Sequence, residues 1–220
     1  MNEDHSTQDG AAPAAGEANP GTAALASAES PAPAEPARPE PPPTFDALPL
    51  SEEVRKAIDE MGYLNPTPVQ LAVWEPATRG RDAVVQARTG TGKTASFGLP
   101  IVDRIIHRNE SGVQALVLCP TRELALQVLA EIERIAQYRG VKSVCVYGGA
   151  SMERQVAALA AGAQLVVGTP GRVLDHIRRR TLHTSSIRLL VLDEADEMLS
   201  MGFERELASI LEALPPTRAS

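Results

Sequence analysis

The chain has 220 residues, of which 43% are hydrophobic and 22% charged, and its formal net charge is −7. No apolar run of roughly 18 residues occurs, and the acidic N-terminus does not resemble a leader peptide, so we expect a soluble, cytoplasmic protein without a membrane partner. The two cysteines, Cys119 and Cys145, lie in apolar runs without histidines at ligand spacing. This pattern predicts buried thiols and argues against a zinc site.

Residues 1–43 differ in composition from the rest of the chain. They hold nine of the 18 prolines and twelve alanines, but no aromatic residue. With seven acids and one base, Arg38, this Ala/Pro/Glu-rich segment carries −6 of the net charge and leaves −1 to the remainder. Such a segment cannot bury enough apolar surface to offset the entropy of ordering, which predicts a disordered tail at 1–43 and a globular domain at 44–220. The nearly neutral globular part neither supports nor excludes binding to nucleic acid.

From Arg81 onward, short apolar runs alternate with helical patterns. The runs that predict strands are Ala83–Gln86, Ala115–Cys119, Ser143–Tyr147, Leu165–Val167 and Leu189–Leu192. The spacing of apolar residues predicts helices near Lys93–His107, Thr121–Gln137, Met152–Ala160 and Arg172–Arg179. This alternation predicts an α/β fold, a parallel sheet with helices on both faces. In such folds, ligands gather at the carboxyl ends of the strands.

The residues after the first predicted strand suit a nucleoside triphosphate. The stretch reads Ala87, Arg88, Thr89, Gly90, Thr91, Gly92, Lys93 and Thr94. Glycines let the backbone wrap the phosphates, so that N–H groups and a helix N-terminus point at their oxygens. Lys93 can then reach the β- and γ-phosphates, and the Thr94 hydroxyl can ligate Mg²⁺. Because Ala87 stands where the general phosphate-loop pattern has glycine, the pattern taken alone is only partly met.

An acidic motif, Asp193-Glu194-Ala195-Asp196, follows the apolar run Leu189–Leu192. Asp193 can hold the metal through water, and Glu194 can polarise the attacking water. An isolated motif of this kind is usually a solvated helix start. Two motifs at the ends of predicted strands favour a hydrolysis site instead, with Lys93, Asp193 and Glu194 as catalytic residues.

Three further motifs follow predicted strands. They are Pro120-Thr121-Arg122, Gly148-Gly149 and Thr169-Pro170-Gly171-Arg172. A helix N-terminus with a nearby arginine suits a phosphate, and paired glycines allow a backbone to approach closely. Such contacts could follow the sugar–phosphate chain of one RNA strand without reading its sequence. Taken singly, each motif is better explained as an ordinary helix cap, and Arg178–Arg180 as a solvated helix end.

Together these motifs resemble the DEAD-box family of ATP-dependent RNA helicases, whose first motif begins with alanine. The block Gly62–Gln70 resembles the Q motif, which reads adenine through Gln70 and has a separate upstream aromatic residue, here Phe45. The resemblance runs from about Thr44 to the C-terminus. Glu197-Met198-Leu199 and Met201-Gly202-Phe203, after the acidic motif, most resemble the bacterial cold-shock (DeaD-like) branch.

The resemblance implies a RecA-like domain that binds ATP, Mg²⁺ and RNA and couples ATP hydrolysis to local unwinding of RNA. In the family, a Ser-Ala-Thr motif and a second RecA-like domain follow, and that domain supplies arginines to the γ-phosphate. We therefore expect residues 44–220 to be a C-terminally incomplete first domain, and the isolated chain to be inactive. The resemblance also implies that the strand between those of the two ATP motifs comes later, which would leave backbone unpaired in the sheet. The alternative is a truncated, non-catalytic module that binds nucleotide or RNA. The sequence does not indicate the RNA substrate or any protein partner.

Overall fold

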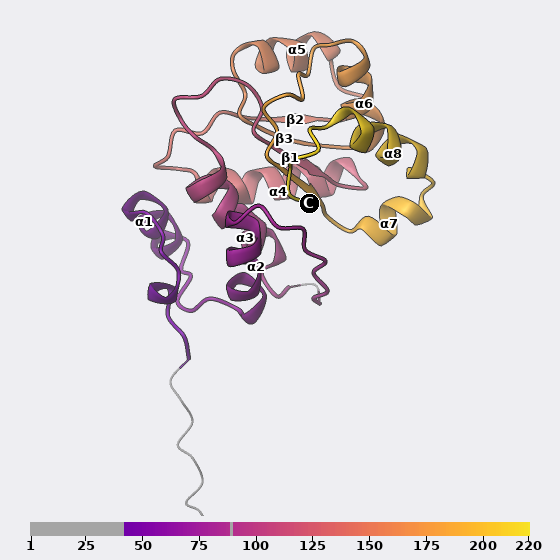
Figure 1. The fold of residues 1–220 in the computed structure, drawn as a ribbon. Coiled ribbons are helices and arrows are strands. Elements are labelled where there is room, and N and C mark those ends of the chain that lie inside the picture. Colours follow the sequence, from indigo (N-terminus) through magenta and orange to yellow (C-terminus); the bar gives the residue numbers. More distant parts are fainter. Residues whose placement is uncertain (1–41, 89) are drawn as a thin grey trace, which may run out of the picture. The chain divides into compact units, whose positions relative to one another are not determined.

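The computed structural model describes residues 42–88 and 90–220 (Figure 1). The predicted disordered tail lies almost wholly outside these residues, as does Thr89. The helices are α1 (Glu52–Glu60), α2 (Pro68–Thr78), α3 (Lys93–Pro100), α4 (Arg122–Ile135), α5 (Met152–Ala160), α6 (Pro170–Arg178), α7 (Ala195–Ser200) and α8 (Glu204–Ala213), with a 3₁₀ turn at Phe45–Ala47. Within the described ranges, no helix is both long and apolar enough to cross a bilayer.

Four parallel strands form one sheet. They are β1 (Ala115–Leu118), β2 (Ser143–Val146), β3 (Leu165–Gly168) and β4 (Leu189–Leu192), in the order β2-β3-β1-β4. The carboxyl ends of the strands are in register, since Leu118 lies opposite both Gly168 and Leu192, and Val146 lies opposite Gly168. The predicted parallel α/β fold is confirmed.

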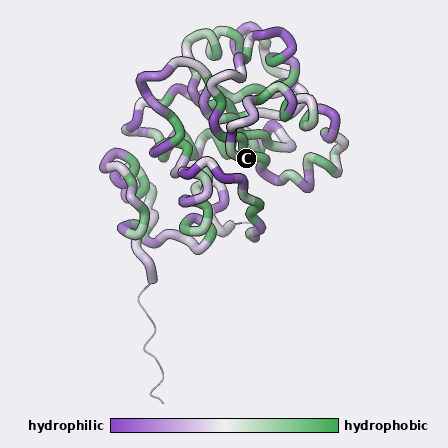
Figure 2. Tube along the Cα trace, in the orientation of Figure 1, coloured by the Kyte–Doolittle hydropathy of each residue, from purple (hydrophilic) through white to green (hydrophobic). Residues whose placement is uncertain are grey.

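Alternate residues of the central strand feed two hydrophobic cores, one on each face of the sheet. Ala115 and Val117 pack into a core with residues of α1–α4, whereas Leu116 and Leu118 pack into a core with residues of α6–α8. Strands buried on both faces are expected to be continuously apolar, which explains the Ala-Leu-Val-Leu sequence of β1. Figure 2 shows these hydrophobic stretches in the interior and hydrophilic stretches in the turns outside.

The predicted strand Ala83–Gln86 is wrong. The segment is extended but belongs to no strand, and Val84 is fully exposed. Its one backbone hydrogen bond to another part of the described chain runs from Ala83 N–H to Ser220 O, 2.9 Å away. On the edge of β4 that faces this segment, a single bridge in the described chain joins Leu189 to Ala219. A strand forms only where a neighbouring backbone accepts and donates its hydrogen bonds, and no described strand lies between this segment and β4.

Within the predicted helix Lys93–His107, the regular α-helix ends at Pro100. Since proline has no N–H group, the α-helical ladder is interrupted there, and Ile101–Ile105 continues as a π-helical turn in which Ile106 N–H donates to Ile101 O. The last predicted helix begins at Pro170 rather than Arg172, because proline suits the first turn of a helix. The remaining predicted boundaries agree with the structure within two residues.

Candidate functional site

The sequence motifs meet at one edge of the sheet, beyond the carboxyl ends of the four strands. The chain leaves β2 at Gly148-Gly149, β3 at Thr169, β1 at Pro120 and β4 at Asp193. Backbone hydrogen bonds join the segments just beyond the strands: Thr169 N–H donates to Val146 O (3.0 Å), Cys119 N–H to Gly168 O (2.9 Å) and Asp193 N–H to Leu118 O (2.9 Å). The three motifs predicted to bind RNA therefore occupy three adjacent strand ends, and the acids occupy the fourth.

The phosphate-loop candidate begins α3. Gly90 and Gly92 have φ values of +79° and +78°, which non-glycine residues rarely adopt. Gly92 directly precedes Lys93, the first residue of α3. A Cβ atom at Gly92 would lie 2.5 Å from the Gln70 Nε2 atom, so a larger residue here would displace the Gln70 amide in addition to straining the backbone.

Gln70 holds the Q-motif helix against this loop. Its side chain is 4% exposed; Oε1 accepts from Thr67 N–H at 2.9 Å, and Nε2 donates to Gly92 O at 3.3 Å. The first bond belongs to a capping box at the start of α2. An amide can make up to four hydrogen bonds, but with the residue 4% exposed both amide atoms are turned toward protein partners in this structure. The contact between Gln70 and adenine stays a prediction.

Phe45 does not offer the aromatic surface for the base that its resemblance to the upstream aromatic residue of the Q motif would predict. Its ring is 3% exposed, packs in the core beside α1, and stacks on Tyr63 with ring centroids 6.4 Å apart. A ring buried in this way holds the Q-motif turn in place and does not offer a face to a ligand. Tyr63 is half-buried and its hydroxyl donates to Glu131; burial raises the pKa of Tyr63 to about 12.

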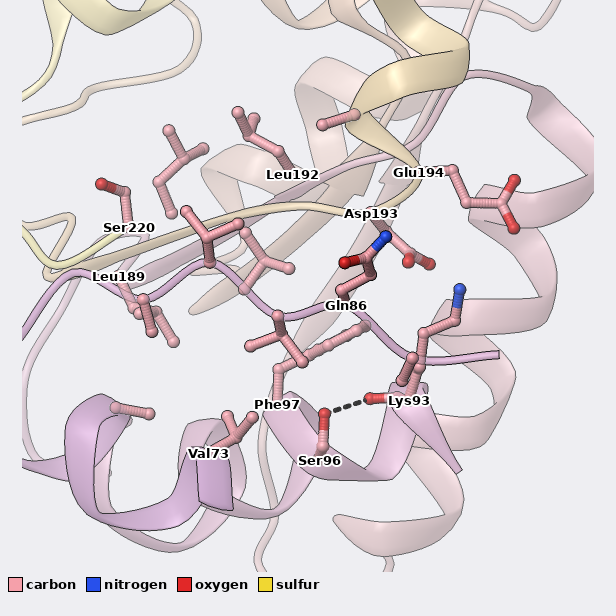
Figure 3. Close-up of a pocket in the computed structure, with 18 of the residues that line it drawn as sticks. Val73, Gln86, Lys93, Ser96, Phe97, Leu189, Leu192, Asp193, Glu194 and Ser220 are labelled. Carbon is pink, nitrogen blue, oxygen red and sulfur yellow. Dashed lines mark hydrogen bonds between the residues drawn. The ribbon is translucent and has the colours of Figure 1, made fainter. Parts of the chain in front are cut away.

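A groove of about 770 Å³ separates β4 from the extended segment before the phosphate loop (Figure 3). β4, Asp193 and Glu194 line one side, and Ala83–Ala87 and Lys93 line the other. Burial raises the pKa of the Asp193 carboxyl, and the charge of Glu194 adds to this effect, whereas the Lys93 ammonium opposes it. The structure therefore brings the predicted lysine and acids to one cavity.

Glu194 has an unusual backbone conformation. Its φ of +54° lies in the left-handed region, which is rare for residues other than glycine, and it immediately precedes α7. Strain of this kind persists only where the surrounding structure enforces it. Here the chain must turn from the end of β4 into α7, and in Figure 3 the Glu194 carboxylate extends away from the Asp193 carboxylate.

The residues present fit a triphosphate with a metal ion. In the described part of the chain, no three His, Cys, Asp or Glu side chains cluster closely enough to hold a metal by themselves. Mg²⁺ prefers six oxygen ligands and commonly takes several from phosphates and water, which matches a site with only Thr94 and Asp193 as candidate ligands. Thr94 lies in the first turn of α3.

The predicted RNA residues form the other part of the edge. Thr121 caps α4, because its hydroxyl accepts from Leu124 N–H at 3.2 Å. Arg122 lies over the ring of Tyr147 at 4.7 Å, and Arg172 donates from Nη1 to Ala150 O at 3.1 Å. Gly148, Gly149 and Gly171 are exposed, whereas Pro120 and Pro170 are buried. The two prolines thus shape their turns and do not present a surface to RNA, which corrects their expected role as contacts.

Sequence reasoning missed the buried polar group behind this edge. Gln155 is 5% exposed and hydrogen-bonds to Tyr147 O and Arg172, and His176 is completely buried and hydrogen-bonds to Gln155. The sequence carried one signal, a glutamine and a histidine on helix faces that otherwise point to the core. Without the tertiary structure, nothing indicated that they meet.

Comparisons with known proteins agree with this site. Residues 67–220 match the family model "DEAD/DEAH box helicase". A DEAD-box ATP-dependent RNA helicase CshA from Geobacillus kaustophilus (strain HTA426) is 48% identical over 175 residues, which cover 80% of this chain and 37% of the relative. A protein of the same name from Bacillus cereus (strain ATCC 10987 / NRS 248) is 45% identical over 174 residues, or 79% of this chain and 33% of the relative.

A solved structure extends the agreement to the fold. The crystal structure of a DEAD box protein from the hyperthermophile Methanococcus jannaschii superposes with a TM-score of 0.76 at 42% identity, covering 80% of this chain and 48% of that one. The chain spans about a third of the length of the two bacterial relatives. These relatives also agree with the resemblance to a bacterial branch. Since the family model covers most of the residues, and the motifs that define the site lie within it, the chain belongs to the DEAD/DEAH box helicase family.

Proposed function

We propose that the chain is the ATP-binding RecA-like domain of an ATP-dependent RNA helicase, in which ATP with Mg²⁺ binds between the phosphate loop and the acids of β4. The observation that carries the proposal is the cavity shared by Lys93, Asp193 and Glu194 at the carboxyl edge of a parallel sheet. Relatives named as ATP-dependent RNA helicases, at 45–48% identity, support it. RNA would lie along the adjacent strand ends.

Each residue has a distinct role in this proposal. Backbone N–H groups after Gly90 and at the start of α3 bind phosphate oxygens, and the Lys93 ammonium neutralises their charge. The Thr94 hydroxyl and, through water, Asp193 would hold Mg²⁺, which would offset negative charge on the phosphates. Glu194 accepts the proton of the attacking water. Thr121, Arg122, Gly149, Thr169 and Arg172 hold the RNA backbone.

A second candidate function is a nucleotide- or RNA-binding module without turnover. It is favoured by the composition of the groove, in which Arg81 is the one arginine among the described lining residues. Arginines facing the γ-phosphate contribute about 10³–10⁵ to the rate in related phosphoryl-transfer enzymes. A groove without them can bind a triphosphate while hydrolysing it slowly.

Titration of the chain with fluorescent ATP and ADP in the presence of Mg²⁺ tests the site. Replacing Lys93 by alanine should weaken ATP binding by about 10–100-fold, because a charge-assisted contact with phosphate contributes about 1.5–3 kcal/mol. Lys142→Ala is the matched control, since Lys142 donates to Ala161 O beyond α5 and does not line the groove. Equal affinities of Lys93→Ala and wild type would refute the phosphate site.

Release of phosphate separates the two candidate functions. Glu194→Gln keeps the size of the side chain but removes its basicity, so a true hydrolase should lose about 10²-fold or more of its turnover while it still binds ATP. Turnover that Glu194→Gln does not change belongs to a contaminant. Binding without any turnover, by contrast, favours the non-catalytic module.

A further inference from the structure

One buried side chain, Gln155 on α5, links two of the three motifs predicted to hold RNA, the Gly148-Gly149 turn and the motif that contains Arg172. Its Nε2 atom donates to Tyr147 O at 3.1 Å, and its Oε1 atom accepts from Arg172 Nη1 at 3.2 Å. The same oxygen lies 2.9 Å from His176 Nε2. Since only 5% of its surface is exposed, the Gln155 amide hydrogen-bonds to these protein partners and is not available to a ligand.

The first two partners lie next to a motif, in the case of Tyr147, or within one, in the case of Arg172. Tyr147 immediately precedes the Gly148-Gly149 turn, and its ring lies under the Arg122 guanidinium, 4.7 Å from the ring centroid. Arg172 bonds to Gln155 and also to Ala150 O, directly after the glycines. One amide therefore fixes the backbone before the turn and the arginine that bonds to the backbone after it.

The third partner, His176, fixes how the amide is oriented. Gln155 Oε1 can only accept, so His176 Nε2 carries a proton and donates to it, whereas His176 Nδ1 lies 2.8 Å from the Thr181 hydroxyl, which donates to His176 O at 3.1 Å. Burial lowers the pKa of His176, and the positive charge of Arg172 adds to this effect. The neutral imidazole thus holds Oε1 in place without competing with Arg172 as a cation would.

The arginine still has capacity for a ligand. Arg172 is half-buried, and both of its hydrogen bonds leave from one nitrogen, Nη1. A guanidinium has five N–H donors in a rigid plane, so fixing one nitrogen also fixes the direction of the others. Holding an arginine in advance reduces the side-chain entropy lost when it binds a phosphate.

We propose that Gln155 is a positioning residue for RNA binding: it orients Arg172 and the Gly148-Gly149 turn toward the same stretch of RNA backbone. The inference rests on the proposed function, because it requires that these motifs bind RNA. Gln155 itself is buried and touches no ligand.

Fluorescence anisotropy of a labelled oligouridylate of about ten nucleotides, titrated with the 220-residue chain, provides the test. Gln155→Met retains the length of the side chain but removes all three hydrogen bonds, and it should weaken RNA binding by about tenfold, since hydrogen bonds to charged groups contribute about 1.5–3 kcal/mol. ATP affinity should change less than about twofold. Gln127→Met is the matched control, because Gln127 is an exposed glutamine on α4 and should bind RNA like wild type.

A double-mutant cycle distinguishes positioning from a general loss of structure. If Gln155 acts largely through Arg172, Gln155→Met should weaken RNA binding by less than about threefold in an Arg172→Ala background. Gln155→Glu keeps the acceptor for Arg172 and His176 and should recover most of the affinity that Gln155→Met loses. Equal losses in both backgrounds, or no loss in Gln155→Met, would overturn the inference.

An NMR measurement on the wild-type chain keeps the test independent of how the variants fold. His176 is completely buried, so RNA cannot touch it, yet RNA bound to Arg172 should shift the His176 Nε2–H signal through Gln155. RNA binding without such a shift contradicts the inference alone. No detectable RNA binding by wild type contradicts the RNA part of the proposed function instead.

Discussion

The two halves of the sheet edge are built differently. On the side of β2, β3 and β1, adjacent strand ends are joined by backbone hydrogen bonds, and the polar side chains behind them have partners. On the side of the phosphate loop, Ala83–Gln86 lies apart from the sheet, a groove separates it from β4, and Glu194 sits in a strained conformation. The half proposed to bind RNA is thus preformed, whereas the half proposed to bind nucleotide is open.

Two buried glutamines illustrate the difference. Gln155 bonds to the backbone before a glycine turn, to an arginine and to a histidine, all within a packed part of the domain. Gln70 reaches the phosphate loop through one bond of 3.3 Å to Gly92 O, and among the described residues of that loop the Thr91 hydroxyl donates to Arg88 O within the loop itself. A loop held at few points can adapt to a ligand, but part of the binding energy is then spent on ordering it.

The largest expected effect concerns the half of the sheet edge that is proposed to bind RNA. A Cβ atom at Gly168, the last residue of β3, would lie 2.3 Å from Val146 O and 2.6 Å from Val146 Cγ2. Gly168→Ala should therefore lower the free energy of unfolding by about 3 kcal/mol, since close-packed backbone cannot move aside. Urea unfolding measures the change.

Two control variants sharpen this result. Gly171 lies inside α6 and no atom lies within 4 Å of the corresponding position, so Gly171→Ala should not lower the stability and should add roughly 0.5–1 kcal/mol through helix propensity. Val84 is fully exposed in the open half, and Val84→Ala should change the stability by no more than about 0.5 kcal/mol. If Val84→Ala destabilised the chain as much as Gly168→Ala, the segment before the phosphate loop would be packed in solution, and the contrast between the halves would fail.

Base selectivity is the next effect in size. Gln70→Ala should weaken ATP binding by about tenfold, because it removes a contact with adenine and the bond to Gly92 O. GTP binding should fall less, because only the loop contact is lost. Titration with both nucleotides measures the difference. An equal loss for ATP and GTP would leave Gln70 with the structural role alone.

A smaller effect is expected where Arg122 lies over Tyr147. Tyr147→Leu removes the cation–π contact and should weaken RNA binding by about threefold, the change expected for a partly exposed pair worth roughly 0.5–1 kcal/mol. Tyr147→Phe retains the ring and should bind RNA like wild type. A loss in the phenylalanine variant would indicate that the hydroxyl, and not the ring, contributes.

The smallest effect is the pH dependence of stability that comes from His176. Its pKa in the folded state lies below the ordinary value, owing to burial and to Arg172 and Arg179, although Asp175 opposes the shift. The unfolded chain therefore binds a proton more readily, and stability should fall as the pH drops below about 6.5. Asp193 acts with the opposite sign, because its pKa is raised.

Thermal unfolding between about pH 7.5 and pH 5.5 isolates the histidine. His176→Gln should lose most of the acid-induced decrease in melting temperature relative to wild type, whereas His183→Gln, at an exposed position, should keep it. Because each variant is compared with wild type, the contribution of Asp193 cancels. Identical pH profiles for all three proteins would exclude His176 as the source.

The sequence predicted most of the fold, and the exceptions have physical causes. Four of five predicted strands exist, since continuous apolar runs bounded by turn residues are typical of strands buried on both faces. The fifth, Ala83–Gln86, is equally apolar but has no neighbouring strand in the described chain. Pairing of this kind depends on residues distant in sequence, so a local pattern cannot decide it. The same holds for Phe45, whose burial depends on α1 and Tyr63.

The sequence by itself predicted which residues would bind a triphosphate, because glycines, Lys93 and the acid pair have few other reasons to follow predicted strands, and the structure brings Lys93, Asp193 and Glu194 to one groove. The sequence also determined the class of fold, through the alternation of apolar runs and helical periods. Only the tertiary structure decided the order of the strands, and with it which motifs are neighbours. It alone brought Gln155, His176 and Arg172 together, since hydrogen bonds between buried side chains depend on how α5 and α6 pack, which no local pattern of residues specifies.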